Sequence, residues 1–137
     1  MKAIAERLKP GQELFQALED LIAKHSIDAG VIVSLVGSVT EAMLRFADQD
    51  EATLIAGPLE IVSATGTIAR SGSHIHLAGA NKQGTTFGGH LMPGSRVYTT
   101  VELVALDLSA SHIFSREFCP LSGYDELVIT VRNQPKE

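Results

Sequence analysis

The chain has 137 residues, 45% of them hydrophobic, which suits one globular domain spanning residues 1–137. Its net charge is −5 and no two of its 11 lysines and arginines are adjacent, whereas nucleic-acid binding usually requires clustered positive charge. The sequence has no apolar run near the roughly 18–20 residues that cross a bilayer and no signal core at its start, so we expect a cytoplasmic protein with no membrane partner.

The first elements expected along the chain are one strand and one helix. Residues 3–8 alternate between apolar and polar side chains, as a half-buried strand does, and Pro10 and Gly11 end this strand. Residues 12–25 carry apolar side chains at helical spacing and basic side chains at their end, where the helix dipole favours them. This segment is the one clear amphipathic helix, with its apolar stripe at Leu14, Leu18, Leu21 and Ile22.

The rest of the chain is dominated by strand patterns. Residues 29–39 form an apolar, β-branched run that is typical of a strand buried on both faces, and residues 40–48 alternate. Residues 52–70 suggest two strands split at Gly57 and Pro58. With further strands expected at 74–80, 85–91, 96–108, 111–118 and near the C-terminus, the sequence predicts an α+β fold. We expect a mostly antiparallel sheet or flattened barrel, with the main helix packed on one side.

Three of the five histidines lie within residues 72–90. His74 and His76 share one face of a strand, because successive side chains alternate, and their Cα atoms should lie roughly 6.5–7 Å apart. A turn at 81–84 would bring His90 back alongside them. Three neutral imidazoles with an open fourth position suit a divalent metal, with zinc as the first candidate. The alternative is that these histidines only decorate a β-sheet and bind no metal.

Several other polar residues are candidates for roles near such a metal. Glu102 is the first candidate for a catalytic general base, for a metal ligand or for a hydrogen-bond acceptor behind a ligand, and Glu60 is a weaker one. Thr100, together with its neighbour Thr99, could donate a hydrogen bond, and Arg96 could hold an anionic substrate. A cupin-type site is disfavoured, because no carboxylate follows within a few residues of His76.

Taken together, the motifs resemble the plants-and-prokaryotes conserved (PPC, also PCC) domain, and the resemblance covers nearly the whole chain. The segments that carry it are RLKPGQELFQALEDLIAKHSIDAGVIVSLVGSV, GPLEIVSATG, SHIHLAGA, GGHL, YTTVELVAL and SREFCPLSGYDELVI, in this order. The resemblance implies a mainly antiparallel α+β domain that assembles as a homotrimer. It also implies that His74, His76 and His90 occupy the metal-binding positions of bacterial members, near the subunit contacts.

Three functional hypotheses follow. The family resemblance implies a DNA-binding or regulatory homotrimer with a divalent metal site, although the chain lacks the basic AT-hook of the plant relatives and its charge does not support direct DNA contact. The second hypothesis is a metal-dependent enzyme that acts on a small molecule through a metal-bound water. The third is a metal-free trimer that only binds a protein partner.

Overall fold

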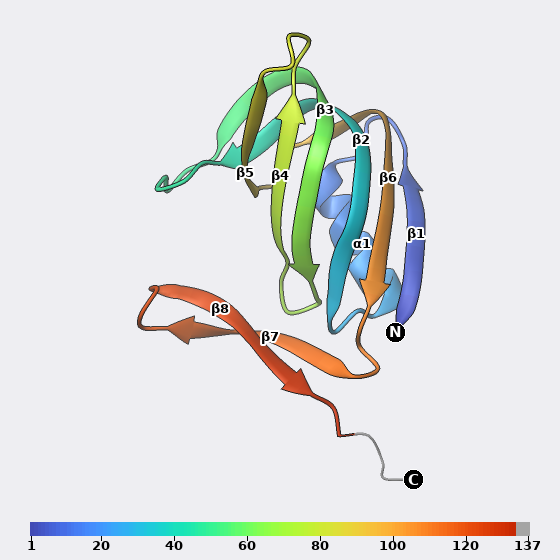
Figure 1. Ribbon diagram of the computed structural model, residues 1–137, viewed down its shortest axis with the longest axis vertical. Coiled ribbons are helices and arrows are strands. Elements are labelled where there is room, and N and C mark those ends of the chain that lie inside the picture. The colour runs from blue at the N-terminus through green and yellow to red at the C-terminus, as the bar shows by residue number, and fades with distance from the viewer. Residues whose placement is uncertain (134–137) are drawn as a thin grey trace.

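The computed structural model describes residues 1–133, and over this range it contains eight strands and one helix (Figure 1). No helix in the described range is long and apolar enough to cross a membrane. The predicted α+β class is confirmed. The elements, in chain order, are β1 (Lys2–Leu8), α1 (Leu14–His25), β2 (Gly30–Arg45), β3 (Thr53–Ile68), β4 (His74–Ala80), β5 (Thr86–Leu91), β6 (Arg96–Asp107), β7 (His112–Cys119) and β8 (Tyr124–Val131).

Six strands form one antiparallel sheet in the order β1-β6-β2-β3-β4-β5. The far end of β2 also pairs with β5, where Leu44 lies opposite Leu91 and Arg45 lies opposite His90. Strands β2, β3, β4 and β5 therefore form a closed ring of paired strands, which corresponds to the predicted flattened barrel. The β2 strand can serve both β3 and β5 because it is 16 residues long.

Helix α1 lies against one face of the sheet, as Figure 1 shows. Its apolar stripe is buried, and the Glu13 carboxylate caps its first turn by accepting hydrogen bonds from the amides of Phe15 and Gln16. The stripe joins the main core with inward residues of β2 to β6. The opposite face of the sheet carries exposed apolar side chains such as Val36 on β2, so the prediction that residues 29–39 are buried on both faces is wrong for the single chain.

The predicted break at Gly57 and Pro58 is also wrong, because β3 runs unbroken from Thr53 to Ile68. Proline lacks an amide proton and normally disrupts a ladder. Here the β2–β3 register shifts between Val39 and Glu41, so the pairing passes over Gly57 and Pro58 and resumes at Leu59. Gly57 and Pro58 on β3 together lie opposite the single residue Thr40 on β2, so a β-bulge in β3 itself accommodates the proline.

The β7–β8 hairpin forms a separate two-stranded ribbon beside one end of the large sheet (Figure 1). Phe114 anchors its base in a small second core with Ala29 and Ala69. The Asp28 carboxylate adds ion pairs with Arg70 and Arg132, the latter at 2.9 Å. Because the base is fixed in this way, residues further along the hairpin reach the outer surface of β4 and β5.

Candidate metal centre

Strand pairing brings the three histidines together. His74 and His76 point outward from β4, while Ile75 between them is 2% exposed and packs in the core, as alternation predicts. The expected turn is present: the Asn81 side-chain carbonyl accepts hydrogen bonds from the amides of Gln83 and Thr85. The returning strand β5 then places His90 directly opposite His76.

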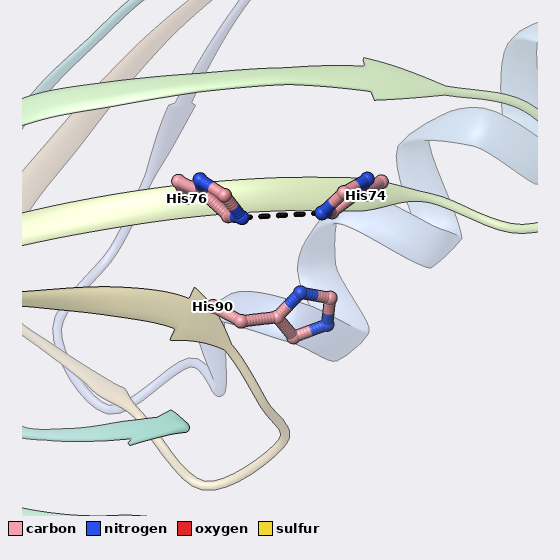
Figure 2. Close-up of side chains that lie close together, drawn as sticks. All are labelled: His74, His76 and His90. Carbon is pink, nitrogen blue, oxygen red and sulfur yellow. Dashed lines mark hydrogen bonds between the residues drawn. The ribbon is translucent and has the colours of Figure 1, made fainter. Parts of the chain in front are cut away.

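The imidazole nitrogens converge on one small region. The Nε2 atoms of His74 and His76 lie 3.1 Å apart, and Figure 2 shows the His90 ring approaching the same region from β5. The ring centroid of His90 lies 5.1 Å from that of His74 and 5.9 Å from that of His76. One ligand nitrogen from each residue can be chosen so that all three lie within 4.8 Å of one another. Within residues 1–133 this is the one cluster of this kind.

This donor set fits a divalent metal ion such as zinc. A tetrahedral site with metal–nitrogen bonds of about 2.0–2.1 Å has ligand nitrogens about 3.3 Å apart. The His74–His76 separation of 3.1 Å is already near that value, whereas the His90 nitrogen, within 4.8 Å of the other two, would have to move closer to them. Three imidazoles leave one coordination position open toward solvent, which is the arrangement of catalytic rather than closed structural zinc sites.

The surroundings favour neutral imidazoles, which are the form that binds metal. Partial burial lowers the pKa of His74, and the neighbouring His76 and the Arg116 guanidinium lower it further, while Glu126 opposes them. Partial burial is also the main cause that lowers the pKa of His90, followed by the guanidinium of Arg45. Protons therefore compete with a metal ion at these two rings at a lower pH than they would at an ordinary histidine.

Metal-free protein is expected to lose stability as the pH falls through about 6.5, the ordinary histidine pKa. The unfolded chain takes up protons there that folded His74 and His90 resist, so the free energy of unfolding rises with pH across this window. Urea denaturation at several pH values in the presence of a chelator measures the slope. His90→Ala should show a shallower slope, whereas His25→Ala on α1 should keep it. Equal slopes in the two variants would contradict this assignment.

Two adjoining open hollows, of about 540 and 470 Å³, meet at the histidines. Arg45, His74, His90 and Tyr124 line both of them. The larger hollow extends along the segment after β2, and the smaller one extends toward β8. The histidines therefore adjoin a space in the size range of small-molecule sites.

The structure does not bring the other predicted residues to the histidines. Glu102, Arg96 and Thr100 all lie on β6, which β2 and β3 separate from β4 in the sheet. The Thr100 hydroxyl accepts a hydrogen bond from Arg7, and Arg96 donates one to the Gly11 carbonyl. Glu102 lies opposite Arg7 of β1 and Val36 of β2, and its side chain is exposed. These residues are near one another along the sequence but not near the site.

The residues that do surround the histidines were missed by sequence reasoning. Arg45 ends β2, and Arg116 and Tyr124 belong to the β7–β8 hairpin. None lies in a motif with the histidines, because strand pairing and hairpin docking bring them there. The sequence held one weak signal for Arg45, because Gly89 beside His90 indicates that another backbone approaches closely there. In the structure that backbone belongs to Arg45, whose carbonyl oxygen would lie 2.7 Å from a Cβ added at Gly89.

Comparison with known proteins gives the family. The model of the Plants and Prokaryotes Conserved (PCC) domain matches residues 1–109, which include the whole six-stranded sheet and all three histidines. The chain belongs to the PCC domain family. The β7–β8 hairpin, which supplies Arg116 and Tyr124, lies beyond the matched residues of this PCC domain.

Several relatives of this PCC chain are similar over most of its length. A hypothetical protein from Salmonella has 42% identity and a TM-score of 0.93, covering 96% of this chain and 95% of that one. The metal-containing protein AF0104 from Archaeoglobus fulgidus has 29% identity and a TM-score of 0.79, covering 93% and 94%. The bifunctional protein GlmU of Synechococcus sp. is 47% identical over 123 residues, which are 90% of this chain. The PCC chain matches only about a fifth of the length of that curated relative.

Two further solved structures, from Bacteroides thetaiotaomicron and Ralstonia eutropha, are described as candidate DNA-binding proteins. Each has a TM-score of 0.80 and 22% identity with this chain. At that identity the likeness establishes the shared PCC fold and nothing further about activity.

Proposed function

We propose that this chain is a metal-binding regulatory protein of the PCC family, which acts as a homotrimer and associates with DNA. Each chain would hold one divalent ion, zinc being the first candidate, through His74, His76 and His90. The observation that carries the proposal is the convergence of the three imidazoles within 4.8 Å at an open hollow. The metal-containing relative from Archaeoglobus, at 29% identity, supports it.

The exposed apolar face of the sheet supports self-association. Val36, Val62 and Val104 lie on the adjacent strands β2, β3 and β6, and each is at least 36% exposed although a single chain of this size buries most such residues. Tyr98 on β6 is also about half exposed. Aromatic and aliphatic side chains of this kind are typical of the centre of a subunit interface. Light scattering of the purified protein should then give three times the chain mass of 14.6 kDa.

The DNA role is tested by fluorescence anisotropy of a labelled duplex with the metal-loaded protein. Binding through 6–10 phosphate contacts should weaken by about 1,000- to 100,000-fold between about 50 and 200 mM salt. The chain charge of −5 requires the basic residues to be gathered on one surface of the assembly for this result. No binding at the lower salt concentration would remove DNA from the proposal and leave the metal-binding trimer.

A metal-dependent enzyme is the second candidate, and the hollow of about 540 Å³ beside the histidines favours it. A divalent ion at this site would supply Lewis acidity at its open position, including a lowered pKa of a bound water. The chain's own contribution would be to position a small molecule with residues such as Arg45 and Tyr124, both of which line the hollow. Turnover of a small molecule that is lost in His90→Ala would favour this candidate.

A further inference from the structure

The two arginines beside the histidines are held there by the same strand pairing that positions the imidazoles. Arg45 is the cross-strand partner of His90, so the two side chains leave the sheet on the same face. Arg116 reaches the other side of the cluster from β7, where its Nη2 donates a hydrogen bond of 3.2 Å to the hydroxyl of Thr67. Thr67 is in turn the cross-strand partner of His74.

Neither guanidinium forms an ion pair with a carboxylate within residues 1–133. Among the ion pairs of residues 1–133, none involves Arg45 or Arg116, whereas Asp28 at the base of the hairpin engages two other arginines. Arg116 makes one side-chain hydrogen bond, to Thr67, which leaves most of its N–H groups available. Within the described residues neither guanidinium has an ion-pair partner, so together with a divalent cation they would form an electropositive centre.

The charges at the rim limit how much negative charge this centre accepts. Asp48 and Asp50 line the larger hollow, and Asp125 and Glu126 line the smaller one. Two guanidinium groups and a divalent ion supply four positive charges, which these four carboxylates balance. A ligand with one negative charge placed at the centre is attracted, whereas a ligand carrying further negative charge toward the rim is repelled by the carboxylates.

We infer that the smaller hollow, which both Arg45 and Arg116 line, binds a small monocarboxylate whose carboxylate takes the open coordination position of the metal and accepts hydrogen bonds from these two arginines. This rests on the proposed three-histidine metal site and names the class of its ligand. Guanidinium groups match the planar carboxylate geometry. Tyr124, which lines both hollows and is 64% exposed, would lie beside the ligand. The β7–β8 hairpin, beyond the residues matched by the family model, thus helps to determine ligand choice.

The test uses protein loaded with cobalt(II), whose visible absorption reports changes in coordination. Titration with acetate and with lactate should give a saturable spectral change, while succinate and inorganic phosphate should bind more weakly than either. Arg45→Gln and Arg116→Gln should each weaken monocarboxylate binding by about tenfold or more, because a hydrogen bond to a charged group is lost. Both variants should still hold one cobalt per chain. Arg96→Gln on β6 is the matched control and should bind as the wild type does.

The possible failures are distinguishable. A protein that holds cobalt but shows no response to acetate or lactate up to about 100 mM overturns the ligand inference and leaves the metal site intact. A dissociation constant at that limit corresponds to a binding free energy of only about −1.4 kcal/mol. Unchanged affinity in both Arg45→Gln and Arg116→Gln overturns it as well, as does tighter binding of succinate or phosphate. A protein that takes up no cobalt overturns the metal site and the ligand inference together.

Discussion

Replacing His90 with alanine is expected to remove the bound metal ion. The wild-type protein should contain about one divalent ion per chain, and the variant should bind it at least about 100-fold more weakly, since even partners that only orient ligands are worth 10- to 100-fold. The remaining pair, His74 and His76, has Nε2 atoms 3.1 Å apart but offers only two ligands. Elemental analysis of tag-free protein at known concentration measures the content directly.

His25→Ala is the matched control for this experiment, because His25 ends helix α1 and belongs to no ligating cluster. It should keep the wild-type metal content, and both variants should retain the circular dichroism of the folded protein. Equal metal content in wild type and His90→Ala would show that the imidazoles do not act together. Absence of metal from the wild type after incubation with zinc would have the same meaning, and the histidines would then be ordinary β-sheet residues.

Gly89→Ala is expected to damage both the fold and the metal site, whereas Gly88→Ala should be tolerated. An added Cβ at Gly89 would lie 2.7 Å from the Arg45 carbonyl oxygen, closer than real contacts permit, so β5 must move away from β2. The same atom at Gly88 would lie 3.4 Å from the Cβ of Ala78, an ordinary contact. The Gly89 variant should lose about 1–3 kcal/mol of stability, the usual cost of overpacking.

Urea denaturation and metal titration of the two glycine variants provide the comparison. Because β5 carries His90, its displacement should also weaken metal binding in Gly89→Ala. Gly88→Ala changes the same strand by the same single methyl group, so it controls for the loss of glycine itself. Similar stability and metal affinity in the two variants would mean that the contact between β2 and β5 does not hold the site together.

Much of the local structure could be predicted from short patterns. The β4 strand was predicted with its observed bounds, and the turn at Asn81 was recognised from its residues. Alternation placed His74 and His76 outward and Ile75 inward, since it depends only on the geometry of an extended chain. The pattern of residues 29–39 misled because an apolar strand looks the same whether its second face is buried in the chain or left exposed.

The surroundings of the site could not be predicted in the same way. Glu102 was a candidate as a carboxylate on an otherwise apolar strand, and Arg96 as a cation that could hold an anionic substrate. However, β2 and β3 separate their strand from β4 in the sheet. Arg45 precedes His74 by 29 residues and becomes its neighbour only because β2 pairs with β5. Arg116 arrives through the docking of a hairpin whose anchor, Phe114, packs against two alanines far away in sequence.

By itself the sequence determined most of the elements, the α+β class and the three candidate ligand histidines, because these depend on residue spacing and on the chemistry of single side chains. Only the tertiary structure decided which charges face the histidines and how large the adjoining hollows are. Strand order and hairpin docking result from the burial of apolar surface summed over the whole chain. A short sequence pattern cannot predict this total burial, so the neighbours of Arg45 and Arg116 can be identified only in the folded molecule.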